Sequence, residues 1–584
     1  MPRKSSYDKY PVVRVSDSAR NCEVGWPAIV ERIRPTLASG RCIVCVECYP
    51  GAFEREIERE LAAGLHPELT VRARECYLTQ SEIRGLCEAD LGDDPVFGRM
   101  DTYYVNDFLD PAKLQRAHDK MQSARGLVLV VGTGASLIAG RWDVLIYADM
   151  ARWEIQMRQR AGTAANLGLD NFDESPGLKY KRAFFVDWRA ADRLKQKLFS
   201  KTDFLLDTNN TKQPKMISGA DLQRGLLLAA CQPFRVVPFF DPGPWGGQWM
   251  REVCDLPQGP PNYAWCFDCV PEENSLLLGF GEISVEVPSL NVVLRHPREL
   301  LGDAVHGRFG TEFPIRFDFL DTMDGGNLSF QVHPLTEYIQ EHFGMPYTQD
   351  ESYYLLDVGE DACVYLGLKE GIDRREMTAD LWKAQKEIYE FPAVKYVNRW
   401  PAKKHDHFLI PAGTPHCSGR NSMVLEISAT PYIFTFKMWD WGRMGLDGRP
   451  RPIHLEHGIN NIQWERTTNW VRANLINQFQ PIQQGDGWCE EHTGLHVREF
   501  IETRRHWFTN EAQHHTKGGV NVLNLCEGEE IVVESPDAKF PPFVVHYAET
   551  FIVPALVGAY TIRPHGPSVG KQCVTIKALV RTSA

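Results

Sequence analysis

Apolar runs alternate with amphipathic stretches over the first 230 residues, which is the pattern of an α/β fold. The segment Arg41–Tyr49 reads RCIVCVECY and is apolar enough for a strand covered on both faces. Helices are predicted over 53–65 and 110–122, the second with Asp110 as N-cap and Pro111 in its first turn. Further strands are predicted in GLVLVVG and WDVLIYADM. Because strands alternate with helices, we expect a mostly parallel sheet.

The hydrophobic pattern changes near Gln232, where QPFRVVPFFDPGPWGGQWM is rich in proline, glycine and aromatic residues. From there to about Trp441, short runs such as SLLLGFGEISVEVP and SMVLEISATPYIFTFK are separated by turns, with one helical insert over 377–391. The remaining residues repeat this β pattern, which is typical of all-β barrels and sandwiches. A chain of 584 residues exceeds one ordinary core. We therefore predict three domains, at 1–231, 232–445 and 446–584.

The composition narrows the class of protein. Hydrophobic residues at 43% and charged residues at 24% are typical of globular proteins and exclude disorder or a coiled coil as the main architecture. No apolar run is long enough to span a membrane and the N-terminus has no apolar leader, so we expect a cytoplasmic protein. The fifteen cysteines lie mostly in apolar segments, which favours reduced, buried thiols.

The charge pattern argues against nucleic acid and membrane partners. The formal net charge is −12, and no block rich in lysine and arginine stands out. The expected partner is therefore a small molecule, and the oligomeric state stays open.

Four residues form a candidate metal site. In NLSFQVHP, Gln331 and His333 are two positions apart, so on a strand they share a face. Glu351 begins another predicted strand, and His416 follows a Pro-x-Gly turn. Two imidazoles with two oxygen donors suit zinc, and manganese, iron or cobalt are chemically possible.

Other histidines compete with this set. His405 and His407 in KKHDHF have equally good spacing, but we interpret them as a polar strand end. His514 and His515 are adjacent, and we interpret them as part of a loop.

The segments NLSFQVHP, DESYYLLD, IPAGTPHCSG, VLEIS and WDWGRMGLDGRPRPIHLEH together closely resemble type I mannose-6-phosphate isomerases, which are zinc-dependent cupin enzymes. The resemblance extends from about Pro233 to the C-terminus, where ETFIVPALVGAYTI resembles the second, metal-free barrel. It implies an all-β double cupin of two jelly-roll barrels. It also implies one zinc per chain, held by Gln331, His333, Glu351 and His416.

The same resemblance implies a reaction and further site residues. The reaction is aldose–ketose isomerisation of mannose 6-phosphate and fructose 6-phosphate through a cis-enediol intermediate. Glu426 matches an active-site glutamate, Lys437 occupies the position of an active-site arginine, and Ser329 matches a serine near the substrate phosphate.

Two positions depart from the family pattern. Gln349 replaces a lysine two residues before the glutamate ligand, and Lys437 keeps the charge of the arginine but loses its bidentate fork. Lys403, Lys404 or the N-terminal domain could supply the missing charge. Two alternatives stay open. One is a metal-containing cupin that binds a sugar or sugar phosphate without turnover, and the other is an isomerase of a different sugar, with or without a phosphate.

The N-terminal domain faintly resembles uridine-kinase-type P-loop folds. At the position of the phosphate-binding loop it reads VECYPGAFERE, without the G-x-x-x-x-G-K-[ST] motif. We therefore expect no phosphoryl transfer, although an active kinase fused to an isomerase is the alternative. A domain of this kind could bind a nucleotide or sugar phosphate, cap the cupin site or mediate assembly.

Overall fold

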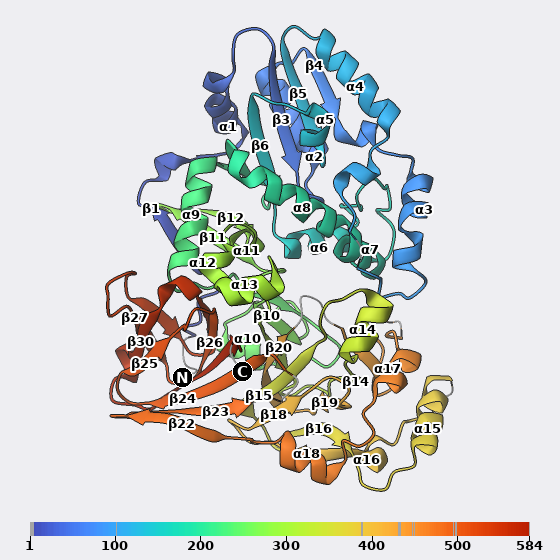
Figure 1. The fold of residues 1–584 in the computed structure, drawn as a ribbon, viewed down its shortest axis with the longest axis vertical. Coiled ribbons are helices and arrows are strands. Elements are labelled where there is room, and N and C mark those ends of the chain that lie inside the picture. Colours follow the sequence, from blue (N-terminus) through green and yellow to red (C-terminus); the bar gives the residue numbers. More distant parts are fainter. Residues whose placement is uncertain are drawn as a thin grey trace. The chain divides into compact units, whose positions relative to one another are not determined.

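The structure is a computed structural model of the chain, and it describes residues 5–100, 102–386, 389–429, 434–446, 448, 450–494, 496 and 499–582. The chain divides into two units (Figure 1). The β unit comprises Met1–Pro11, Ala230–Asn274 and His296–Ala584, and the α/β unit comprises Val12–Ala229 and Ser275–Arg295. Among the described helices, none combines the length and apolar character needed to cross a membrane.

The α/β unit is built on a seven-stranded sheet with the order β2-β8-β7-β6-β3-β5-β4. The strands from β4 to β7 in this order run parallel to one another. β8 is antiparallel to β7, and β2 is antiparallel to β8. Every residue of β3 is buried, because helices cover both faces. The predicted parallel sheet is thus confirmed. The strands are β2 (Cys22–Val24), β3 (Cys42–Cys48), β4 (Leu69–Arg72), β5 (Leu127–Gly132), β6 (Val144–Asp149), β7 (Phe204–Asp207) and β8 (Lys215–Ser218).

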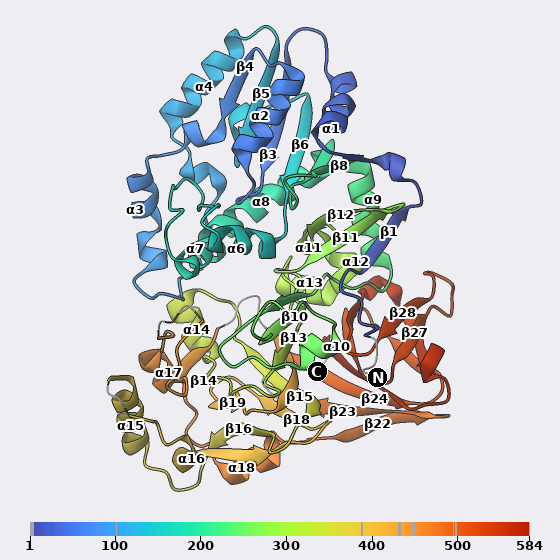
Figure 2. The ribbon, with the colours of Figure 1, turned by 180° about the vertical axis from the view of Figure 1, so that it is seen from behind.

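The helices of this unit include those predicted from the sequence. Ile29 of α1 and Ile57 and Leu61 of α2 pack with the apolar side chains of the sheet, on the face seen in Figure 2. Asp110 caps α4 by accepting hydrogen bonds from the backbone N–H groups of Ala112 and Lys113. The helices are α1 (Trp26–Ile33), α2 (Glu54–Leu65), α3 (Gln80–Leu91), α4 (Pro111–Ser123), α5 (Ala135–Ala139), α6 (Arg152–Arg160), α7 (Pro176–Arg182), α8 (Trp188–Leu198) and α9 (Gly219–Cys231).

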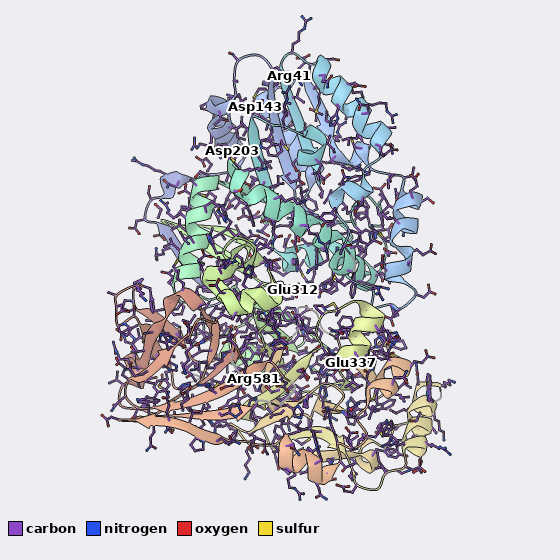
Figure 3. The ribbon with its side chains drawn as sticks, viewed as in Figure 1. Arg41, Asp143, Asp203, Glu312, Glu337 and Arg581 are labelled. Atoms are coloured by element: carbon purple, nitrogen blue, oxygen red, sulfur yellow. The ribbon has the colours of Figure 1, made fainter. Side chains whose placement is uncertain are left out.

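The amino ends of the parallel strands lie along one edge of the sheet, marked by Arg41, Asp143 and Asp203 (Figure 3). Asp143 accepts a hydrogen bond from the backbone of Ile43, and Asp203 accepts one from the backbone of Leu145. These contacts tie neighbouring strands together at that edge. The opposite edge, with the carboxyl ends, is therefore the one available for loops that bind ligands.

A small second sheet in this unit differs from the sequence interpretation. The run SLLLGFGEISVEVP, predicted as part of the β domain, forms β11 (Ser275–Phe280) and β12 (Ile283–Pro288). β11 pairs in parallel with β1 (Val12–Ser16), and α11 (Leu290–Arg295) follows. Asn291 of α11 hydrogen-bonds Asp149 and Lys195 of the same unit. Pairing with a distant strand is not encoded in the local pattern, and the three-domain division stays a prediction.

The β unit contains two pairs of antiparallel sheets. The first pair has the orders β18-β15-β20-β13-β10-β9 and β17-β16-β19-β14-β21. Its strands are β9 (Phe239–Asp241), β10 (Trp265–Cys269), β13 (Arg316–Asp321), β14 (Phe330–Val332), β15 (Asp350–Val358), β16 (Cys363–Leu368), β17 (Val397–Pro401), β18 (His407–Ile410), β19 (His416–Ser418), β20 (Ser422–Ala429) and β21 (Phe436–Trp439). Residues 430–433 of the predicted run SMVLEISATPYIFTFK lie outside the described residues.

The β unit also contains several short helices. The helical insert predicted over 377–391 corresponds to α15 (Arg374–Lys386). The helix begins three residues earlier than predicted, residues 387–388 lie outside the described residues, and residues 389–391 are not helical. The other helices are α10 (Trp249–Val253), α12 (Pro297–Leu301), α13 (Asp303–Phe309), α14 (Thr336–Phe343), α16 (Ala393–Tyr396), α17 (Leu455–Asn461) and α18 (Thr468–Asn474).

The second pair of sheets has the orders β22-β23-β24-β31-β26-β29 and β25-β30-β27-β28. Apolar side chains of both sheets, among them Phe508, Leu523, Ile531 and Tyr560, form one core. The strands are β22 (Gln480–Gly485), β23 (Trp488–Gly494), β24 (Ile501–Phe508), β25 (Ala512–His515), β26 (Asn521–Glu527), β27 (Glu530–Glu534), β28 (Phe543–His546), β29 (Thr550–Val553), β30 (Ala559–Pro564) and β31 (Cys573–Val580). The fifteen cysteines are free thiols, and nearly all are buried, as predicted.

Candidate metal centre

The four predicted ligands meet between the first two sheets of the β unit. Gln331 lies on β14 directly opposite His416 of β19, and His333 follows β14 by one residue. Glu351 lies on β15 in the other sheet. Because successive strand residues point to opposite faces, Gln331 and His333 share the face that meets Glu351. All four side chains are buried.

The ligand atoms of His333, Glu351 and His416 converge. The two carboxylate oxygens of Glu351 lie 3.1 Å from His333 Nε2 and 2.8 Å from His416 Nε2. The amide nitrogen of Gln331 lies 3.2 Å from the same His416 nitrogen. His333, Glu351 and His416 form a group with ligand atoms within 4.8 Å of one another, and they are the one such group among the described residues.

The tautomer of each imidazole is set by the hydrogen bond of the ring nitrogen that does not face Glu351. His333 Nδ1 lies 2.8 Å from the carbonyl oxygen of Phe434, and His416 Nδ1 lies 2.8 Å from that of Thr414. A carbonyl oxygen only accepts, so each Nδ1 must carry a hydrogen. In a neutral imidazole each Nε2 then directs a lone pair at Glu351.

A lone pair that faces a carboxylate is stabilised only by a proton or a metal cation between the two atoms. A divalent cation meets this requirement, and ligand bonds of about 2.0–2.2 Å let atoms this close share one ion. The donor set of two imidazole nitrogens, one carboxylate and one amide therefore fits a metal such as zinc.

The electrostatics of the group agree with this arrangement. Burial disfavours the ionised form of Glu351, but the two histidines more than offset burial and hold the pKa of Glu351 well below its usual value. Burial likewise opposes protonation of His333, but Glu351 outweighs burial and raises the pKa of His333. The pKa of His416 is lowered, because burial prevails there. The centre thus stabilises one ionised carboxylate and attracts positive charge.

Gln349 holds the glutamate ligand in place, a role that the sequence analysis did not identify. Its side-chain N–H₂ donates to Glu351 at 3.0 Å, and its oxygen accepts from the backbone N–H of Phe434 at 2.8 Å. Phe434 is the residue whose carbonyl oxygen binds His333. One buried amide therefore links the orientations of two ligands, and both ends of the amide are used.

Glu426 lies beside the candidate ligands on β20. It faces Asp318 across one strand pair and Tyr353 of β15 across the other. Burial, with the nearby carboxylates of Glu351 and Asp318, raises the pKa of Glu426 well above its usual value. A hydrogen bond to Glu351 contributes to that increase. Glu426 is therefore a carboxyl group that holds its proton more tightly than usual next to the centre.

Lys437 and Ser329, the two remaining predicted site residues, both lie beside Gln331. Lys437 is paired with Gln331 between β14 and β21, which places their side chains on the same face. The pKa of Lys437 is lowered to about 7 by burial, with a further contribution from Arg451. Ser329 precedes Gln331 by two residues, and its hydroxyl donates to Asp440 at 2.8 Å. The two predicted residues are thus adjacent to the ligand group.

Arginines that the sequence analysis did not select surround this region. Arg451 donates to Ser329 Oγ and to Asp440 Oδ2, both at 2.9 Å, and Arg443 donates to Asp440 at 2.6 Å. Together with Lys437, three basic side chains surround one carboxylate. The signal in the sequence was the RPRP segment shortly after DWGR, but the contact between Arg451 and Ser329 spans 122 positions.

The competing histidines do not join the centre. His407 is the first residue of β18, so the predicted strand end is confirmed, but its side chain is fully buried. His514 lies on β25 rather than in a loop, buried and stacked on Tyr560, whereas His515 is exposed. Strand alternation places the two neighbours on opposite faces.

Comparison with known proteins gives two separate results. Residues 25–230 match a family described as a domain of unknown function (DUF8485). The mannose-6-phosphate isomerase ManA of Bacillus subtilis is 25% identical over 238 residues, which are 40% of this chain and 68% of that protein. The mannose-6-phosphate isomerase of Streptococcus mutans is 27% identical over 240 residues, which are 40% of this chain and 69% of that protein.

A solved structure covers a larger part of the chain. It is the mannose 6-phosphate isomerase of Bacillus subtilis, with a TM-score of 0.49 and 19% identity over 59% of this chain and 99% of that one. The relationship to these isomerases rests on the sequence matches. Over about 40% of its length, this chain is homologous to mannose-6-phosphate isomerases.

Proposed function

We propose that the protein is a zinc-dependent aldose–ketose isomerase that interconverts mannose 6-phosphate and fructose 6-phosphate. The observation that carries the proposal is the pair of imidazole Nε2 atoms directed at Glu351, in a chain homologous to isomerases of this name. In this proposal Gln331, His333, Glu351 and His416 hold one zinc per chain. Bound there, the ion would polarise the carbonyl and hydroxyl oxygens of an open-chain sugar.

We assign the proton chemistry to Glu426 and Lys437. Isomerisation moves a proton between neighbouring carbons and requires groups that accept and release protons near the reacting atoms. Glu426 lies near Glu351 and has a raised pKa, and Lys437 lies across the strand pair from Gln331. The two residues therefore flank the ligand group from different sheets.

Ser329 and Arg451 are proposed to bind the substrate phosphate. A guanidinium that already bonds a serine hydroxyl is pre-oriented for an oxyanion, and Arg451 provides the planar fork that Lys437 lacks. Arg443 and Lys437 add positive charge around Asp440. This cluster supports a phosphorylated substrate despite the lysine that is missing at Gln349.

The proposal is tested by turnover. Metal-stripped protein is assayed for conversion of mannose 6-phosphate to fructose 6-phosphate, with and without added zinc, and beside free mannose. We expect zinc to restore turnover of the phosphate ester. We also expect Glu426→Gln to lose turnover by about 10²–10⁴-fold while retaining zinc, which is the usual contribution of general acid–base catalysis.

A second candidate is a metal-containing protein that binds sugar phosphates without turnover. The observation that favours it is Gln349, because both ends of its amide are occupied and it provides no cation for substrate. In this case the zinc-loaded protein would bind mannose 6-phosphate, and Glu426→Gln would leave that affinity unchanged. Absence of turnover for both sugars, with zinc bound at one equivalent, would exclude an isomerase of these two sugars.

A further inference from the structure

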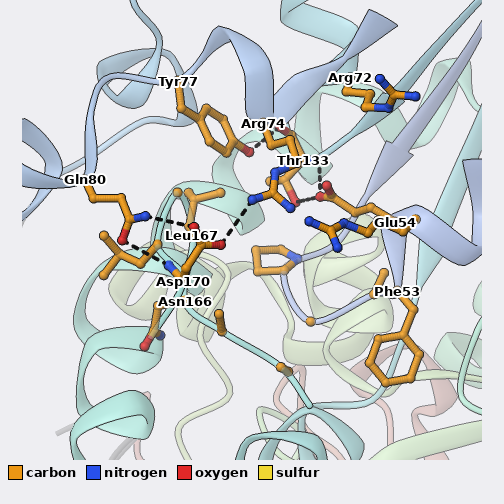
Figure 4. A pocket seen from close by; sticks show the side chains of 18 of the residues that line it. Phe53, Glu54, Arg72, Arg74, Tyr77, Gln80, Thr133, Asn166, Leu167 and Asp170 are labelled. Atoms are coloured by element: carbon orange, nitrogen blue, oxygen red, sulfur yellow. Dashed lines mark hydrogen bonds and ion pairs between the residues drawn. The ribbon is translucent and has the colours of Figure 1, made fainter. Parts of the chain in front are cut away.

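The α/β unit contains a polar cavity of about 450 Å³ that is separate from the candidate metal centre (Figure 4). It lies at the carboxyl ends of β3, β4 and β5, where loops following three adjacent parallel strands meet. Open α/β sheets bind ligands at this edge, and the volume suits one small molecule. Position and size therefore indicate a binding site.

Four basic side chains line the cavity. Arg72 ends β4 and Arg74 follows two positions later, Arg55 lies on the first turn of α2, and Lys113 comes from α4. Arg55 is exposed and has no ion-pair partner among the described residues. Lys113 donates to the carbonyl oxygen of Tyr77 at 2.6 Å, which leaves further N–H donors on the ammonium group. The four side chains come from three separate segments and converge on one space.

The acidic groups of the cavity compete only weakly for these cations. Arg72 pairs with Glu58 through two hydrogen bonds and also with Glu75. Arg74 pairs with Asp170, but the two arginine side chains are 45% and 40% exposed. Ion pairs between side chains this exposed contribute little to stability, because solvent screens them. A doubly charged oxyanion can therefore replace one carboxylate contact without a large loss.

The acidic side chain of Glu54 is hydrogen-bonded to Thr133, which also lines the cavity. Its carboxylate accepts from the backbone N–H of Thr133 at 2.8 Å and from the Thr133 hydroxyl at 3.2 Å (Figure 4). Burial raises the pKa of Glu54, and the bonds to Thr133 and the nearby Arg74 partly offset that increase. The bonds to Thr133 direct this carboxylate toward the end of β5.

One side of the cavity is held open by a polar network. Gln80 and Asp170 exchange two hydrogen bonds, at 2.8 and 3.2 Å, and Asp170 also bonds Arg74 (Figure 4). Tyr77 donates to the carbonyl oxygen of Thr133 at 2.7 Å. The side chains that face the cavity are thus fixed by contacts from its rim, so the cavity is pre-formed.

We propose that this cavity binds a small phosphate monoester, with the phosphate group between Arg55, Arg72 and Arg74. The turn between β3 and α2 reads Tyr-Pro-Gly-Ala-Phe over residues 49–53 and contains no lysine, serine or threonine. It therefore lacks the cation and the hydroxyl that phosphoryl transfer requires at this position. The site binds its ligand without transferring the phosphate.

The proposal is tested by calorimetry on the full chain in the Arg451→Ala background, which removes the phosphate contact proposed for the β unit. Inorganic phosphate, adenosine monophosphate and mannose 6-phosphate are titrated separately. We expect at least one of the two esters to bind with one site per chain. Arg55→Gln and Arg74→Gln should each weaken that binding by about tenfold, the effect of losing one charge-assisted hydrogen bond.

Arg59→Gln is the matched control, because Arg59 lies on the same helix as Arg55, is exposed and does not line the cavity. Arg55→Gln removes no ion pair and so tests the site even if Arg74→Gln loosens the loop around Asp170. The proposal is overturned if neither ester binds, or if the three variants bind the ester alike. The two esters distinguish a nucleotide ligand from a sugar phosphate ligand.

Discussion

His416 directs Nε2 at Glu351 from 2.8 Å, while its other ring nitrogen is bonded to the carbonyl oxygen of Thr414. The backbone thereby fixes the tautomer, and the lone pair that remains faces a carboxylate. We therefore expect purified protein to hold one equivalent of divalent metal. His416→Ala should weaken metal binding by more than the roughly 10–100-fold that loss of an outer-sphere partner costs.

Metal content after dialysis and the thermal shift on adding zinc measure this effect. The exposed His515 provides a control, since His515→Ala removes an imidazole without changing the centre. Retention of one tightly bound equivalent by His416→Ala would contradict the assignment of the ligands.

Arg451 should control affinity for the substrate phosphate. Arg451→Ala removes the guanidinium that bonds Ser329 and Asp440, so KM for mannose 6-phosphate should rise about tenfold or more, with a smaller change in kcat. Arg451→Lys should recover only part of the loss, because an ammonium group lacks the planar fork. Steady-state kinetics decide this. Lys571→Ala, which changes an exposed lysine, serves as the control, and a KM that stays at the wild-type value in Arg451→Ala would count against the phosphate site.

Lys195 and Asp149 form a buried ion pair in the α/β unit, with Nζ 2.8 Å from Oδ1. Lys195→Met would leave the carboxylate of Asp149 buried without its cation, so the free energy of unfolding should fall by about 3–5 kcal/mol. Adding Asp149→Leu should recover much of that loss, since the unpaired charge is then absent. Lys197→Met, two residues along the same helix and exposed, should change little. Urea unfolding measures all three variants, and wild-type stability of Lys195→Met would refute the argument.

Glu47 should make the stability of the α/β unit depend on pH. Its buried carboxylate accepts from the backbone N–H groups of Gly134 and Ser136, yet burial dominates and raises its pKa to about 7. The unfolded chain releases this proton near its ordinary pKa, whereas the folded chain retains it. The contribution of protonated Glu47 to the free energy of unfolding is therefore complete at pH values below its ordinary pKa. This contribution, on the order of 2–3 kcal/mol, is lost as the pH rises toward about 7.

Glu47→Gln should remove this dependence, because the amide does not ionise. Melting temperatures at pH 5 and pH 7.5 for the wild type and the variant check it, with exposed Glu88→Gln as the control. Equal slopes for the wild type and Glu47→Gln would contradict the prediction.

The candidate metal centre shows which site residues can be predicted from the local sequence pattern. The two-residue spacing of Gln331 and His333 already places both on one face of a strand, and the Pro-x-Gly turn before His416 indicates a strand start. Gln349 and Arg451 did not stand out in this way. Gln349 reads as the loss of a lysine, and only its contacts with Glu351 and Phe434 reveal a positioning role.

The sequence by itself determined the elements whose signals are local: the mostly apolar, buried β3, the Asp110 cap of α4 and the alternating strands after residue 232. It also supplied the candidate ligand types in their order. The tertiary structure alone decided which strands pair and which side chains meet. SLLLGFGEISVEVP alternates like any β hairpin, yet it pairs with β1 more than 260 positions away. The physical reason is range. Side-chain alternation and helix capping depend on neighbouring residues, whereas strand partners and buried polar contacts depend on which distant surfaces together exclude water.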